Sequence, residues 1–182
     1  QSLLLSWKDL RSENTDPMVE INYLVYAQPL LGEGYYTELR RARETHPDWA
    51  TLAILEVSFL EQLGDSKAAL KTVEQAIAQF PSAVSLMVQR AEIQIRLEEY
   101  AAAEENMKQL LVREPNTAAA HALLAGIYAH LDQDDKRLKH MLLALGDEIP
   151  KSEQLDFMQT YARHLINQGQ EKEAHKLWNF CI

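Results

Sequence analysis

The chain contains 182 residues, 47% of them hydrophobic and 25% charged, which is ordinary for a globular protein with a sizeable apolar core. Its formal net charge of −9 argues against a sequence-independent nucleic-acid binder, because such a protein needs a basic face. The single cysteine, Cys181, excludes an internal disulfide, and no apolar run reaches the roughly 18–20 residues of a membrane helix.

The amino-terminal stretch bears on the origin of the chain. The sequence begins with Gln1 rather than Met, and "SLLLSW" is too short and too uncharged at its start for a signal peptide. We therefore expect a soluble segment, cytoplasmic or periplasmic, taken from a longer or membrane-anchored protein.

Residues 1–49 are expected to form partial and degenerate helical repeats. "LLLSWKDL" suits the second helix of a unit whose first half lies outside this sequence. Thr15–Pro17 is a helix start signal with proline in the first turn. Pro29 is expected to kink or end the helix that follows, and "LGEGYY" to form the turn after it.

Residues 50–83 read as a pair of helices. "TLAILEVSFLEQL" is apolar at a spacing of three to four residues, and "GDS" interrupts it. "KAALKTVEQAIAQF" resumes the helical period until Pro81 ends it. Its inward stripe is rich in alanine, so we expect it to bury area by close stacking against neighbouring helices.

This pattern recurs along the chain with a period of 34 residues. Pro47, Pro81 and Pro115 keep the spacing, and Pro150 follows after 35 residues. Other positions keep it too: Leu63, Leu97 and Leu131; Val73, Met107 and Met141. We therefore expect further repeats at 84–117 and 118–151 and a degenerate one at 152–182, all within one continuous domain, 1–182.

The repeated residues resemble the tetratricopeptide repeat family. The unit from Ala118 offers Leu124, Ala125, Tyr128 and Leu131 where the family has leucine, a small residue, an aromatic residue and leucine, whereas Glu56 and Val57 depart from the leucine–small pair in the unit from Ala50. The resemblance implies an all-α fold, a right-handed α-solenoid of antiparallel helix pairs with about 4–5 repeats.

The resemblance also implies a binding surface. In the family, the first helix of each unit lines a concave groove that holds partner proteins. Carried over to this sequence, the groove residues are Ile54, Ser58, Glu61, Val88, Glu92, Ile95, Arg96, Ala122, Gly126, Ala129, His130 and Arg163.

Two features of this groove bear on the partner. Family members that clamp a terminal carboxylate use Lys, Arg and Asn at places that here hold Ile54, Ser58, Gln89, Ala119 and Leu123, so we expect an apolar or helical segment instead. Glycine inside a helix lowers the stability of the helix by roughly 1 kcal/mol relative to alanine. The presence of Gly126 therefore needs an explanation. It either lets a partner approach the helix backbone, or, together with Ala122, accommodates a neighbouring helix.

The sequence offers no constellation for catalysis. The histidines form no HExxH motif and no pair at i,i+4, "LGEGYY" lacks the rest of a phosphate loop, and Cys181 near the end has no defended pocket. The acidic pairs Glu98–Glu99, Glu104–Glu105 and Asp134–Asp135 lie around helix starts, where the helix dipole favours them, or on solvent faces. We expect no enzyme activity, no cofactor and no metal.

These observations favour a non-catalytic protein–protein interaction scaffold in a larger bacterial assembly. The alternative is a substrate-guiding or regulatory part of an enzyme, such as a glycosyltransferase, whose catalytic domain is absent from this chain. A third interpretation is self-assembly into a homo-oligomer through the solenoid ends. "HKLWNFCI" bears on the third, because Trp178 and Phe180 either pack inward or leave an exposed patch.

Overall fold

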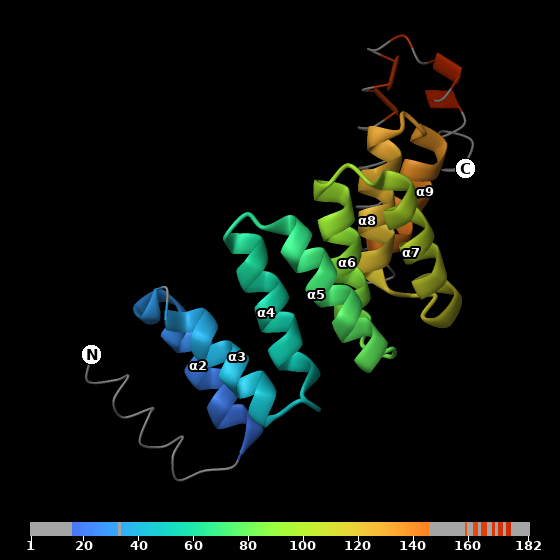
Figure 1. Ribbon diagram of the computed structural model, residues 1–182. Coiled ribbons are helices and arrows are strands. Elements are labelled where there is room, and N and C mark those ends of the chain that lie inside the picture. Colours follow the sequence, from blue (N-terminus) through green and yellow to red (C-terminus); the bar gives the residue numbers. More distant parts are fainter. Residues whose placement is uncertain are drawn as a thin grey trace. The chain divides into compact units, whose positions relative to one another are not determined.

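The computed structural model describes residues 16–32, 34–145, 159, 162–163, 165–166, 169, 171–172 and 174–175. Regular structure in 16–32 and 34–145 is entirely helical, as expected. The helices are α2 (Pro17–Leu31), α3 (Gly34–Thr45), α4 (Ala50–Gln62), α5 (Ser66–Gln79), α6 (Val84–Arg96), α7 (Tyr100–Arg113), α8 (Ala118–His130) and α9 (Asp134–Leu145), as Figure 1 shows.

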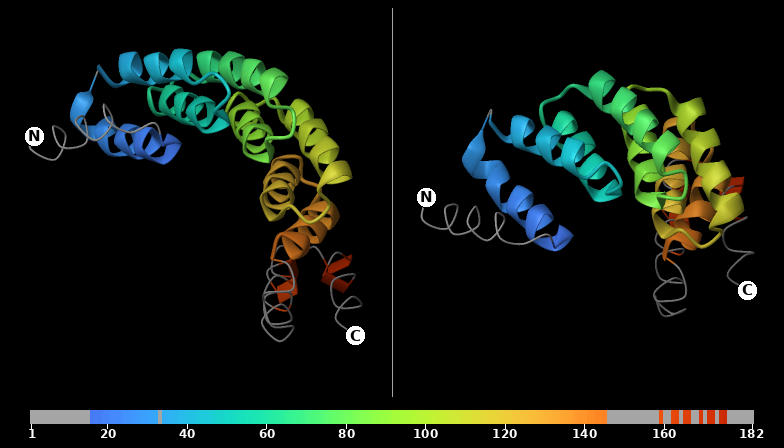
Figure 2. Two further views of the ribbon diagram at one scale, coloured as in Figure 1. Left: turned by 90° about the horizontal axis from the view of Figure 1, so that it is seen from below. Right: turned by 60° about the horizontal axis from the view of Figure 1, so that its bottom comes forward.

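The chain divides into two compact units, Gln1–Leu97 and Glu98–Ile182, with the boundary between α6 and α7. In the first unit, successive helices pack against each other and α4 also contacts α6. Figure 2 shows these helices in two layers, with α2, α4 and α6 in one and α3 and α5 in the other. In the second unit, α8 packs against both α7 and α9.

Helix starts follow the period of the sequence. Helices α4, α6 and α8 begin 34 residues apart, and so do α5, α7 and α9. Local chemistry fixes individual starts: the Asp65 carboxylate accepts a hydrogen bond from the Ala68 amide at 3.0 Å, and Asp16 caps α2 through the Met18 amide at 2.9 Å. Pro17 occupies the first turn of α2, where its missing N–H costs nothing.

The turn inside each helix pair requires left-handed backbone at the same repeat position. Gly64 has φ of 76°, and the residues in its register, Glu98 and Asp132, have φ of 61° and 52°. Only glycine adopts this region without steric cost, so the second unit holds a strained acidic residue where the first has glycine. Gly169, after the expected insertion near residue 150, has φ of 77°.

Small residues let the helices pack closely. In the first unit, Ala53, Ala69 and Ala76 are buried beside Val57, Val73 and Leu86. In the second unit, Ala103 and Ala120 are buried together with Leu110, Leu124 and Ile127. Alanine on the inner stripe limits the apolar area that one helix contributes, so neighbouring helices are needed to complete each core.

The first helix pair differs in detail from the expectation. Pro29 does not end α2, because it lies in the last turn and the helix continues to Leu31. Gly32, with φ of 52°, makes the turn predicted within "LGEGYY".

Among the described residues, no helix combines the length and apolar character needed to cross a bilayer. The predictions for "LLLSWKDL", Pro150, Trp178, Phe180 and Cys181 lie outside the described residues.

Candidate functional site

Seven of the predicted groove residues lie in the first unit, on helices α4 and α6 of one layer. Ile54 and Ser58 on α4 are half-buried, as are Val88 and Ile95 on α6. Glu92 and Arg96 on α6 are exposed, whereas the side chain of Glu61 on α4 is only 11% exposed. The structure therefore places these residues on two adjoining helices, with Glu92 and Arg96 exposed and the other five only partly accessible.

Polar contacts use several of these positions to fasten α4 to α6. The Gln89 side-chain amide donates to Ser58 Oγ at 2.8 Å and to the Ile54 carbonyl oxygen at 3.3 Å. Arg96 forms an ion pair with Glu61. Because Ser58 and Glu61 serve these contacts between helices, they have less capacity left for a ligand.

The α8 face in the second unit is open. Ala122 and Gly126 are exposed one turn apart on α8, and Ala129 one turn later is half-buried. His130 is exposed at the end of the helix, where its ring stacks on Tyr100 of α7 with centroids 4.9 Å apart. Between Ala122 and Ala129 this strip carries nothing larger than a methyl group, so the α8 backbone is accessible along it.

Gly126 has room for a side chain. Apart from its chain neighbours and its own helix backbone, a Cβ built on it would meet no atom of the described residues within 4 Å. In the part of the chain that the structure describes, close packing of a neighbouring helix therefore gives no reason for glycine here. This geometry favours the explanation in which a partner approaches the α8 backbone.

Arg163, the remaining predicted residue, also lies in the second unit and is exposed. Two further groove positions of its repeat are Ile166, which is 41% exposed, and half-buried Gln159.

The structure brings two histidines together between α8 and α9, and neither is among the predicted groove residues. The ring of His121 donates from Nε2 to the Pro115 carbonyl oxygen at 3.0 Å, since a carbonyl can only accept. Its Nδ1 is then an acceptor, and His140 donates to it from Nδ1 at 2.9 Å. Burial first, and then the electrostatic interaction with His121, lower the pKa of His140. The sequence separation of the two residues gives no signal for this contact.

Glu104 on α7 joins α7 to α8. The Tyr128 hydroxyl donates to it at 2.8 Å, and Lys108 forms an ion pair with it at 2.7 Å. The hydrogen bonds from Lys108 and Tyr128 lower the pKa of Glu104. Burial and the bond to Glu104 raise the pKa of Tyr128 to about 12. Glu104, expected on a solvent face or near a helix start, is thus an element of the second unit's packing.

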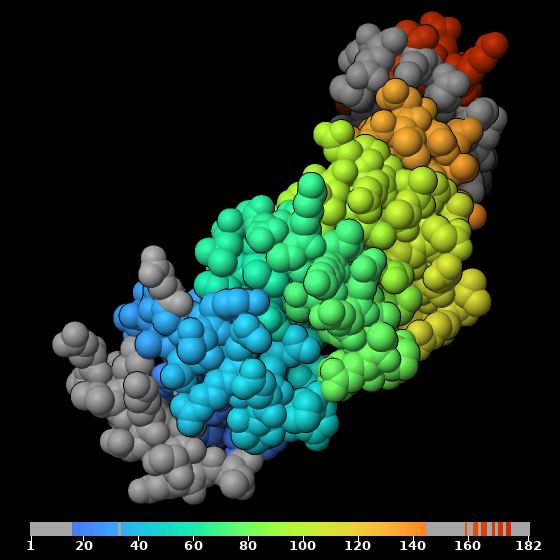
Figure 3. All heavy atoms as spheres, viewed as in Figure 1, coloured from blue at the N-terminus to red at the C-terminus, as the bar shows by residue number. Residues whose placement is uncertain are grey.

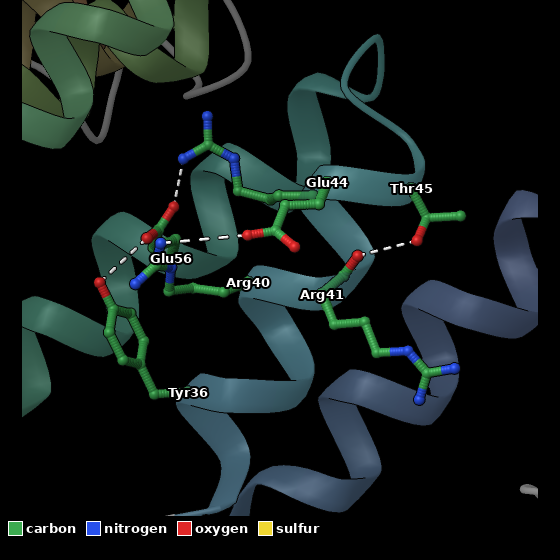
Figure 4. A network of polar contacts seen from close by, with 7 residues as sticks. Tyr36, Arg40, Arg41, Glu44, Thr45 and Glu56 are labelled. Carbon is green, nitrogen blue, oxygen red and sulfur yellow. Dashed lines mark hydrogen bonds and ion pairs between the residues drawn. The ribbon is translucent and has the colours of Figure 1, made fainter.

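Glu56 on α4 is a buried charged residue of the first unit. Its carboxylate accepts a hydrogen bond from the Tyr36 hydroxyl at 3.1 Å and pairs with Arg43, both from α3 (Figure 4). Its charge in the apolar run "TLAILEVSFL" was the available sequence signal, since a buried carboxylate needs a partner. Within the described residues, no three His, Cys, Asp or Glu side chains gather as a metal site would require.

The fold is that of a helical-repeat protein built from two-helix units. Residues 60–127 match the family model of the tetratricopeptide repeat. This is the family that the repeated residues of the sequence resemble. A comparison with curated proteins finds no match.

Several solved structures share the fold. PilW, described as a widely conserved type IV pilus biogenesis factor, has a TM-score of 0.69 at 17% identity, covering 95% of this chain and 80% of its own. MamA from Desulfovibrio magneticus RS-1 has a TM-score of 0.65 at 15% identity, covering 90% and 92%. TTC0263, a thermophilic TPR protein in Thermus thermophilus, has a TM-score of 0.61 at 20% identity, covering 89% of each chain. These similarities confirm the predicted fold class, an all-α solenoid of the tetratricopeptide repeat type.

Proposed function

We propose that this chain is a non-catalytic protein–protein interaction scaffold that holds a segment of a partner protein against the first helices of its repeats. The observation that carries the proposal is the α8 face, where Ala122 and Gly126 are exposed and Gly126 has open space beside it. A surface without long side chains admits a helix or an extended segment close to the backbone, which increases van der Waals contact.

The partner segment is apolar or helical rather than a carboxylate tail. Ile54, Val88 and Ile95 supply half-buried apolar surface on the first unit, and Ala122 and Ala129 do so on the second. A carboxylate would need cationic donors at the clamp positions, but Ser58 and Gln89 stand there and hydrogen-bond each other.

The setting we propose is a larger bacterial assembly. PilW, with the same fold, is described as a biogenesis factor for the type IV pilus, and this description supports a role in assembly rather than in chemistry. The proposal does not extend to the pilus itself, because the likeness lies in the fold.

A capture experiment with matched variants tests the proposal. The tagged full chain and the double variant Ala122→Glu/Gly126→Glu are exposed to a lysate of the source organism, and captured proteins are quantified by mass spectrometry. The control is Ala101→Glu/Ala102→Glu, which adds the same charge to exposed alanines of α7. Circular dichroism and thermal melting establish that all three proteins are folded.

We expect the α8 variant to lose the specific partner while the α7 variant retains it. Glutamate side chains would occupy the approach to the backbone and would bury a charge against an apolar segment. Equal capture by both variants would refute the α8 face as the binding surface.

A further inference from the structure

A cleft of about 470 Å³ lies among α3, α4 and α5 of the first unit. It is separate from the contacts that join α4 to α6, because its walls come from α3 and α5 in the other layer (Figure 2). Side chains of α3 (light blue) and α5 (green) make up this part of the surface in Figure 3. The volume falls within the range of about 300–1,000 Å³ found for ligand sites.

Glu56 and Arg43 form the inner part of this cleft. The Glu56 side chain is 8% exposed, and Arg43 on α3, whose side chain is 26% exposed, pairs with it. Tyr36 donates to the same carboxylate, and burial followed by the Glu56 charge raises the pKa of the tyrosine. The Arg43 guanidinium is thereby held in one position, with donors beyond those that one carboxylate uses.

Stability gives no reason for a carboxylate at this position. In the second unit, Leu124 occupies the position two repeats after Glu56 and is fully buried. A buried ion pair is commonly no more stabilising than apolar side chains of similar volume. What Glu56 supplies, and leucine would not, is an orienting partner for Arg43.

Further cations stand at the rim. Arg40 on α3 has a 61% exposed side chain, and its ion pair with Glu44 is 4.0 Å long, a distance at which such exposed pairs contribute little. Lys71 on α5 is exposed and forms no ion pair within the described residues. The cleft thus gathers three cations against two carboxylates, Glu44 and Glu56.

The neutral groups of the cleft distinguish between kinds of anion. Thr72 and Gln75 on α5 offer both donors and acceptors. A peptide backbone uses both at every residue, whereas inorganic phosphate at neutral pH is mainly an acceptor and needs chiefly donors. The acceptor oxygens therefore favour a polypeptide that carries carboxylates.

We propose that this cleft binds an acidic segment of a protein partner, with Asp or Glu carboxylates placed between Arg43, Arg40 and Lys71. The site lies on a different set of helices from the α8 face, and only the kind of partner, a protein, is shared with the function proposed above. Its failure and the failure of the α8 proposal are distinguishable, because each is tested with its own variants and its own ligand.

Chemical-shift mapping on the ¹⁵N-labelled full chain tests the site directly. The probe is an acetylated peptide of alternating glutamate and alanine, six residues long. The controls are the same peptide with glutamine for glutamate, and inorganic phosphate. We expect the acidic peptide to shift the amide signals of residues around Arg43, Lys71 and Gln75 and to leave those around Gly126 unchanged. Equal shifts with the glutamine peptide, or the same shifts with phosphate alone, would overturn the proposal.

Charge-matched variants distinguish specific binding in the cleft from non-specific attraction of the acidic peptide to surface cations. Arg40→Gln and Lys71→Gln should each weaken the acidic peptide by about threefold, the effect of losing one partly exposed charge pair. Arg41→Gln removes the same charge from α3, but Arg41 is exposed, does not line the cleft and points away from Glu56 in Figure 4. An equal loss in Arg41→Gln would refute a specific site.

Glu56→Leu separates orientation from stability. It introduces the residue that the second unit has at this position. Because the Arg43 left behind is partly exposed to water, we expect a smaller loss of stability than from Arg43→Ala, while peptide affinity falls at least about threefold as Arg43 loses its orienting partner. Should the leucine variant fold poorly, Glu56→Gln keeps the shape and removes the charge. Unchanged peptide affinity in a folded variant would contradict the role assigned to Glu56.

Discussion

The two units place different residues at the same repeat positions. Ile54 and Ser58 on α4 correspond to Ala122 and Gly126 on α8, two repeats later. In the first unit, Gln89 bonds to Ser58 and to the Ile54 carbonyl oxygen, and so links neighbouring helices. In the second unit the corresponding strip is exposed and small. The same two repeat positions therefore hold helices together in the first unit and form an accessible surface in the second.

The largest effect we expect comes from the buried pair of the first unit. Arg43→Ala would leave the Glu56 carboxylate buried without its cation. The second unit has no such pair to lose, because Leu124 stands at the position of Glu56. Removing one partner of a buried pair costs about 3–5 kcal/mol, and the partial exposure of Arg43 reduces our expectation to about 2–3 kcal/mol. Urea denaturation measures the loss. The double variant Arg43→Leu/Glu56→Leu should recover most of it, and failure to recover would contradict this account of the pair.

The left-handed turn position also differs between the two units. Gly64→Ala should destabilise the protein by about 1–2 kcal/mol, because alanine is strained at a φ of 76°. Asp132→Gly should do the opposite in the second unit, with a gain of about 0.5–1 kcal/mol, since aspartate tolerates this backbone only partly. Thermal unfolding of both variants provides the test. Two changes of the same sign would show that backbone strain does not govern this turn.

Gly126→Ala should separate stability from binding on the α8 face. A Cβ has room there, so alanine should stabilise the helix by about 0.5–1 kcal/mol. The same methyl group should weaken partner binding, because it holds the partner away from the backbone. Denaturation and affinity measurements on one variant are sufficient, with Ala122→Gly as the inverse control. A destabilised variant would show that Gly126 is required by packing.

The smallest effect we expect is a pH dependence of the second unit. The groups that face His140 come from α7, α8 and α9: Glu104, Lys108, His121, Tyr128 and Lys139. The pKa of His140 is lowered in the folded protein from its ordinary 6.5, so the unfolded chain binds more protons below that pH. This contribution to stability is present above about pH 6.5 and is lost as the pH falls through the folded pKa.

Unfolding between pH 7.5 and 5.5 measures this dependence while excluding most carboxylate titration. His140→Asn keeps a donor for His121 but removes the titrating group, so its stability should vary less with pH over that range. An identical slope in the variant would assign the dependence to other groups.

Much of the fold was predictable because it rests on local and periodic signals. The proline spacing predicted the paired helices, and Asp16 with Pro17 predicted the start of α2. Left-handed backbone at Asp132 follows from its register with Gly64. The contacts of Gln89 and the pair of His121 with His140 were not predictable, because they depend on side-chain orientations across separate helices.

Amide hydrogen exchange of the full chain, alone and saturated with its purified captured partner, shows whether the partner covers the α8 face. If the partner lies on the α8 face, the amides of Ala118–His130 should exchange more slowly in the complex. Unchanged exchange along α8, with slowing confined to other helices, would contradict the claim.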